Sequence, residues 1–128
     1  MQMMLRNPTT SIYPATPDYA HALEVRNPGR LLFVSGTMGL DPDGRAADTL
    51  DAQLSLIWSN LRAILADAGM STDNIVRVTS YLRDAVYVEA NQNARLAALG
   101  GRTVPTTAII VQTLSEDWLV EIEIIAAG

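Results

Sequence analysis

The sequence predicts an α+β fold in which two helices pack on one face of a mixed sheet. Two observations support this prediction. Apolar residues recur every three or four positions between residues 50 and 68, which is typical of an amphipathic helix. Short β-branched runs surround it, giving the order strand–strand–helix–strand–helix–strand–strand. Helices covering one face of a sheet leave the other face for water or for another subunit.

The chain length of 128 residues predicts one domain spanning residues 1–128. Its first segment, residues 1–12, is expected to be an extended N-terminal arm. Pro8, Pro14 and Pro17 disfavour a regular helix in this region.

Two strands are expected before the first helix, at residues 21–25 and 31–34. The turn sequence Asn27-Pro28-Gly29 separates them. A small segment, residues 35–39, follows the second strand. It contains two glycines, which permit close approach of the backbone to another group.

The first helix has recognisable boundaries. Asp48 or Thr49 can cap its N-terminus, and Gly69 stands where a glycine ends a helix. Alternating residues then predict a strand at 75–82, and a second helix is expected at about 86–99.

The C-terminal segment is expected to form an antiparallel hairpin. Two β-branched runs, residues 104–114 and 118–126, flank a short polar turn. In the second run, apolar residues alternate with Glu121 and Glu123, so both carboxylates share one face. That face is either solvated or paired with another group.

The composition excludes several kinds of chemistry. There is no Cys, which rules out disulfides and thiolate catalysis, and no Lys, which rules out a pyridoxal phosphate Schiff base. The single histidine, His21, belongs to no metal-binding motif. We therefore expect neither a metal site nor pyridoxal phosphate.

The charge pattern narrows the choice of partners. The net charge is −5, and the nine basic residues are arginines scattered singly along the chain. Nucleic-acid binding needs a basic stripe, so no nucleic-acid partner is expected. Apolar runs are too short for a membrane span or a signal peptide, which predicts a cytoplasmic protein without a membrane partner. The 48% hydrophobic content favours self-association.

An ordered set of short motifs runs through most of the chain. The motifs are Pro17-Asp18-Tyr19, Leu32-Phe33-Val34-Ser35-Gly36, Asp41-Pro42-x-Gly44, Gln53, Asn60-Leu61, Ala68-Gly69, Ile75-Val76-x-Val78-Thr79-x-Tyr81-Leu82-x-Asp84, Asn91, Pro105 and Val120-Glu121-Ile122-Glu123. This order resembles the RidA/YjgF family of reactive-intermediate deaminases, also called L-PSP endoribonuclease-like proteins, over residues 13–127.

The resemblance implies a chorismate-mutase-like fold and a homotrimer with three clefts between subunits. In RidA itself, water attacks an enamine or imine derived from an amino acid and releases ammonia. By position, the glutamate that orients this water is Glu121. Cleft-lining residues fall on Tyr19, Ser35 and Asn91. The resemblance implies no cofactor.

The sequence departs from the family where an arginine binds the substrate carboxylate. Ungapped counting places Thr106 there, and a one-residue deletion would place Thr107 there. A threonine hydroxyl cannot replace a charge-assisted pair. Arg102 is the nearest candidate for a replacement cation. Arg77 or Arg83 could also reach the cleft from a neighbouring subunit.

Three functions remain open from the sequence. The first is a small-molecule hydrolase of the deaminase type that acts on a neutral or cationic enamine, imine or related reactive metabolite. In it, Glu121 positions water, and Ser35, Asn91 and Thr106 form hydrogen bonds. The second is a trimeric metabolite-binding protein without catalysis. The third, a ribonuclease or translation inhibitor, is disfavoured by the acidic charge.

Overall fold

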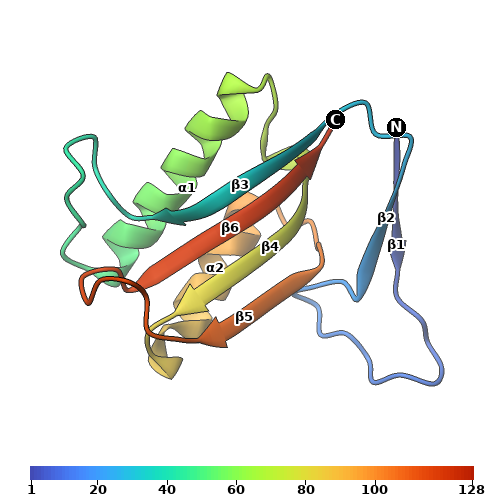
Figure 1. Cartoon of the computed structure of the whole chain (residues 1–128). Coiled ribbons are helices and arrows are strands. Elements are labelled where there is room, and N and C mark those ends of the chain that lie inside the picture. The colour runs from blue at the N-terminus through green and yellow to red at the C-terminus, as the bar shows by residue number, and fades with distance from the viewer.

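The computed structural model describes residues 1–128 and has two helices and six strands (Figure 1). Two short 3₁₀ turns, Thr72–Asn74 and Ala85–Tyr87, precede β4 and α2. The elements in chain order are β1 (Gln2–Arg6), β2 (Ala22–Arg26), β3 (Leu31–Met38), α1 (Leu50–Asp67), β4 (Ile75–Leu82), α2 (Val88–Ala98), β5 (Thr106–Ile110) and β6 (Val120–Ala127).

The main sheet has four strands in the order β3-β6-β4-β5, and both helices lie behind it (Figure 1). Strand β6 runs antiparallel to β3 and β4, whereas β5 runs parallel to β4. The sheet is therefore mixed, as the sequence predicted. The β1–β2 pair forms a separate two-stranded sheet beside it.

The predicted C-terminal hairpin is wrong. Strands β5 and β6 do not pair, because β4 lies between them. The β-branched pattern identified both strands but carried no information about their neighbours. A parallel β4–β5 pair needs a long crossover connection, and α2 supplies it.

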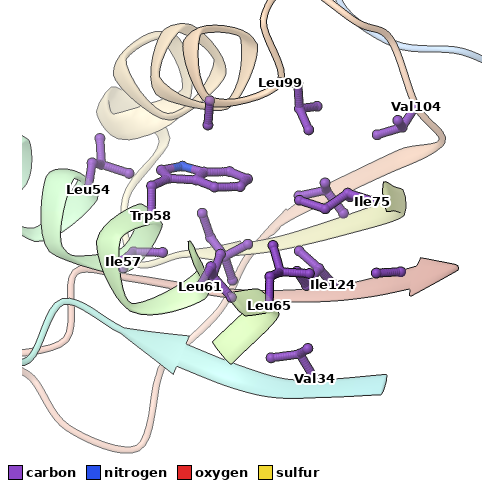
Figure 2. Close-up of a cluster of buried hydrophobic side chains, with 14 of the residues drawn as sticks. Val34, Leu54, Ile57, Trp58, Leu61, Leu65, Ile75, Leu99, Val104 and Ile124 are labelled. Carbon is purple, nitrogen blue, oxygen red and sulfur yellow. The ribbon is translucent and has the colours of Figure 1, made fainter. Parts of the chain in front are cut away.

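The core lies between the sheet and the two helices (Figure 2). Helix α1 begins as predicted, with the Thr49 hydroxyl accepting a hydrogen bond from the Ala52 amide, and Gly69 follows it at φ +69°. The helix buries Leu54, Ile57, Trp58, Leu61 and Leu65. These residues pack over the alternate residues of β6 that face the helices: Val120, Ile122, Ile124 and Ala126.

A buried amide holds the start of β6 in place. Gln53 on α1 is 2% exposed. It donates to the Ala47 and Asp117 carbonyls at 2.9 and 2.7 Å and accepts from the Leu119 amide at 3.0 Å. Helix α1 therefore fixes where Glu121 emerges.

The face of the sheet opposite the helices is uncovered and partly apolar. Leu31, Phe33 and Ile109 are 54, 71 and 45% exposed. No helix in the structure has the length and apolar character needed to cross a membrane. The exposed apolar residues give this open face the character of an interaction surface.

Candidate functional site

Glu121 lies on the open face of the sheet, beside an irregularity in β3. The β3–β6 register shifts between Val34 and Thr37, where Ser35 and Gly36 stand. A side chain at Gly36 would overlap the Glu121 carboxylate. Glycine therefore makes room for this carboxylate, which is the use that the two-glycine segment of the sequence suggested.

Glu123 lies on the same face of β6 and accepts a hydrogen bond from the Tyr81 hydroxyl. The sequence left this face either solvated or paired with another group; the structure shows a half-buried Glu123 carboxylate with a partner. We call Gly36, Tyr81, Glu121 and Glu123 the open-face cluster.

The open-face cluster carries negative charge without a paired cation. Neither carboxylate belongs to an ion pair; the three ion pairs of the chain are Arg6–Glu24, Arg26–Glu24 and Arg95–Asp18. Burial, and then the charge of Glu123, raise the pKa of Glu121. The hydrogen bond to Glu123 and burial raise the pKa of Tyr81. The raised pKa makes Glu121 a better proton acceptor near neutral pH than an ordinary glutamate.

A second group of polar residues lies on the helical side of the sheet, at the β5 edge. Asn91 and Arg95 are one turn apart on α2, and each is 3% exposed. Arg95 Nη1 donates to the Thr106 hydroxyl at 3.0 Å and to the Asp18 carbonyl at 2.9 Å. Arg95 Nη2 pairs with the Asp18 carboxylate at 3.0 Å.

These residues line a small, partly open cavity of about 190 Å³. Tyr19 lines it together with Asp18, Asn91, Arg95 and Thr106. We call these five residues the helical-side pocket. Three of the residues that the resemblance assigned to a cleft, Tyr19, Asn91 and Thr106, are thus brought together.

The other predicted site residues lie elsewhere in the chain. Glu121 and Ser35 belong to the open-face region, and Ser35 is exposed on β3. Thr107 is also exposed, and its hydroxyl accepts a hydrogen bond from Arg77 at 3.0 Å. Thr106 contacts α2 whereas Glu121 does not, so one chain divides the predicted residues between two faces of its sheet.

Arg102 does not serve as the replacement cation in this structure. Its guanidinium donates to the carbonyls of Thr72, Asp73 and Ile75 at 2.9 to 3.1 Å. It therefore holds the turn before β4. Arg83 is likewise occupied, by Thr113 and the Ser115 carbonyl.

The cation beside Thr106 is Arg95, which sequence reasoning missed. Its four-residue spacing from Asn91 was the available signal, because that spacing places both side chains on one helix face. Nothing in the sequence indicated that this face meets β5.

The titratable residues do not form a metal centre. No group of three or more His, Cys, Asp or Glu side chains is placed to hold a metal ion.

The fold and the two polar regions define an α+β domain with a carboxylate on an uncovered sheet and a buried polar pocket at the sheet edge. The family model described as Endoribonuclease L-PSP matches residues 9–128. The chain belongs to this family, the RidA/YjgF family that the ordered motifs resembled, and has its chorismate-mutase-like fold.

Individual relatives agree with this assignment. A RutC family protein of Pyrococcus abyssi is 32% identical over 111 residues, covering 84% of each chain. One from Aquifex aeolicus is 39% identical over 67 residues, which span 52% of this chain and 51% of the relative. The chain thus matches about half the length of that relative.

Solved structures extend the similarity across the chain. A Rid-family protein of Yersinia pestis, YyfB, superposes with a TM-score of 0.85 at 27% identity, covering 100% of both chains. RidA from Psychrobacter superposes with a TM-score of 0.72 at 26% identity, over 95% of this chain and 98% of that one.

Proposed function

We propose that this protein is a hydrolase of the deaminase type that converts a neutral imine or enamine into the corresponding carbonyl compound and ammonia. The observation that carries the proposal is the Glu121 carboxylate, seated over Gly36 without a cation partner. Its raised pKa suits a group that takes a proton from water. Membership of the family named above supports the same chemistry.

The reaction requires one base and one water. Glu121 accepts a proton as the water oxygen bonds to the imine carbon, and passes it to the nitrogen, which becomes an amine. Glu121 then takes the proton of the new hydroxyl group and passes it to this amine. The C–N bond breaks, and ammonia leaves as the C=O bond forms. Water and imine thus yield ketone or aldehyde and ammonia, with no redox change.

The active unit in this proposal is a homotrimer. Glu121 and the helical-side pocket lie on opposite sides of the sheet in one chain, so they can share a substrate only across two chains. The exposed Leu31, Phe33 and Ile109 of the open face supply the apolar surface that such an interface needs.

The preference for a neutral substrate follows from the charges. Thr106 replaces the family arginine, and the Arg95 that contacts it is already paired with Asp18. A substrate carboxylate would therefore meet no free cation in the pocket, and Glu121 and Glu123 would repel it.

The test compares the decay of two imines generated in situ. A flavin amine oxidase acting on benzylamine supplies a neutral imine, and an amino-acid oxidase acting on alanine supplies 2-iminopropionate. We expect the protein to accelerate decay of the neutral imine more strongly. Trapping of the remaining imine with semicarbazide gives its lifetime.

Two variants at neighbouring positions make the test specific. Glu121→Gln should abolish the acceleration. Glu123→Gln, on the same strand and face, should retain the acceleration. The acidic limb of its pH–rate profile should shift to lower pH, because the charge of Glu123 no longer raises the pKa of Glu121. No acceleration of either imine by the wild type would contradict the proposal and favour a binding protein without catalysis.

A further inference from the structure

The helical-side pocket has unused hydrogen-bonding capacity. Arg95 Nε and Asn91 Oδ1 are both buried and have no partner. Both residues line the same cavity of about 190 Å³. A buried polar atom without a partner is unfavourable, so a group that pairs with both atoms would be held firmly.

The two atoms require different hydrogen-bonding groups on a ligand. Arg95 Nε is a donor and needs an acceptor, whereas Asn91 Oδ1 is an acceptor and needs a donor. A carboxylate offers only acceptors and so cannot satisfy Asn91 Oδ1. A primary amide offers a carbonyl oxygen and an N–H within one planar group.

The charge of the pocket favours the same choice. The Arg95 guanidinium is neutralised by Asp18 at 3.0 Å. Burial by itself raises the pKa of Asp18, but hydrogen bonds from Thr16 and Arg95 outweigh burial and lower it, so Asp18 is ionised at neutral pH. A bound anion would be a second negative charge beside one cation, with the cost of its own desolvation.

We propose that the helical-side pocket binds a neutral carbamoyl group, with its carbonyl oxygen on Arg95 Nε and its N–H on Asn91 Oδ1. This inference rests on the proposed function and deepens it. It makes the substrate an imine or enamine with a carbamoyl substituent away from the reacting carbon. Arg95 is then a specificity-determining residue that recognises a carbamoyl group, whereas the family arginine that Thr106 replaces binds a carboxylate.

The size of the cavity is consistent with this role. Drug-sized ligands occupy pockets of about 300–1,000 Å³, so this cavity suits one substituent of a ligand. It is also larger than a single water requires. The experiment must distinguish a carbamoyl-binding pocket from a pocket filled only by water.

The experiment observes the Arg95 side chain directly. In a ¹⁵N-labelled protein, the Nε–H signal of Arg95 is assigned by its loss in Arg95→Lys. Propionamide and sodium propionate, which have matched shapes, are then titrated at neutral pH. We expect propionamide to shift the Arg95 signal to saturation and to bind at least about tenfold more tightly than propionate.

Two variants test the role of the Asp18 charge. Asp18→Asn leaves Arg95 without its counter-charge and should reverse the preference toward propionate. Asp67→Asn, which removes an exposed carboxylate at the end of α1, makes the same change in net charge and should leave the preference unaltered. Tighter binding of propionate by the wild type would overturn the proposal. Failure of both compounds to shift the signal would also overturn it, leaving a water-filled pocket.

The same titration separates this inference from the proposed function. Glu121→Gln should bind propionamide as the wild type does. Imine hydrolysis without propionamide binding would contradict the carbamoyl pocket alone. Propionamide binding without imine hydrolysis would contradict the hydrolase alone.

Discussion

Charged side chains are paired with an opposite charge on one face of the sheet and are unpaired on the other. On the helical side, Asp18 and Arg95 are paired at 3.0 Å, and Arg95 is 3% exposed. On the open face, Glu121 and Glu123 share a strand without any paired cation. The first arrangement is electrostatically balanced; in the second, burial and then the charge of Glu123 raise the pKa of Glu121.

The difference contrasts a buried charge whose partner is fixed with a carboxylate that has no cation partner. Buried charge is tolerated on the helical side because its partner is fixed. The open-face cluster keeps an unfavourable arrangement, which is common at sites that carry chemistry. Substitutions on the two faces should therefore have different consequences.

The largest effect should come from the packed side of the sheet. Ile122→Ala, at a residue with 0% exposure, should lower the free energy of unfolding by about 4 kcal/mol, because it leaves a cavity in the core. Ile109→Ala on the open face should lower the free energy of unfolding of the separated chain far less. It should weaken self-association instead. Urea unfolding and sedimentation measure the two effects. Equal destabilisation by both substitutions would mean that the faces do not differ as described.

Removing the buried cation should be nearly as damaging. Arg95→Met leaves the Asp18 carboxylate unpaired, and we expect a loss of about 3 kcal/mol in the free energy of unfolding. Arg77→Met, which loses only a hydrogen bond to Thr107, serves as the control and should cost about 1 kcal/mol or less. Adding Asp18→Asn to Arg95→Met should restore part of the loss. A double variant no more stable than Arg95→Met would contradict the pairing.

A substitution at Gly36 should separate activity from stability. The Cβ atom added by Gly36→Ala would displace the end of the flexible Glu121 side chain. Misplacement of a reacting group by about 1 Å can cost about a hundredfold in rate, so we expect a loss of that size in imine hydrolysis. The midpoint of urea unfolding should change little. A fully active Gly36→Ala would show that the position of this carboxylate is unimportant.

The smallest effect should be a gain in stability on the open face. Because the folded-state pKa of Glu121 is raised, its carboxylate opposes folding as pH rises above the unfolded value of about 4.3. Glu121→Gln should therefore be more stable than the wild type at pH 7, by less than about 1 kcal/mol, since the group is partly solvated. The gain should vanish below pH 4, as unfolding curves at several pH values can establish. Destabilisation at pH 7 would contradict the direction of the pKa shift.

Much of the fold was predictable because its signals are local. The three- and four-residue spacing of α1, its Thr49 cap and the alternation along β4 all act within a few residues. Strand order is not local. The runs at β5 and β6 appeared to be a hairpin, and only tertiary packing decides that β4 lies between them.

The candidate site was predictable in part for the same reason. Glu121 stands out because a carboxylate follows each of the buried residues Val120 and Ile122, and Gly36 because glycine permits close approach. Arg95 was missed, since the contact of Arg95 with Thr106 joins a helix to a strand. Arg102 was a possible replacement cation because it is near Thr106 in sequence, but its side chain bonds to the turn before β4 instead.

In the proposed homotrimer, one site is built from the open face of one chain and the helical-side pocket of another. Mixing two inactive variants tests this arrangement. Glu121→Gln disables the first half and Asn91→Leu the second, and the two chains are unfolded, mixed in equal amounts and refolded together. In a ring of three, each cleft draws its halves from neighbouring chains, so about a quarter of the clefts should be intact. We therefore expect recovery of about a quarter of wild-type imine hydrolysis. Activity no higher than that of either variant alone would contradict it.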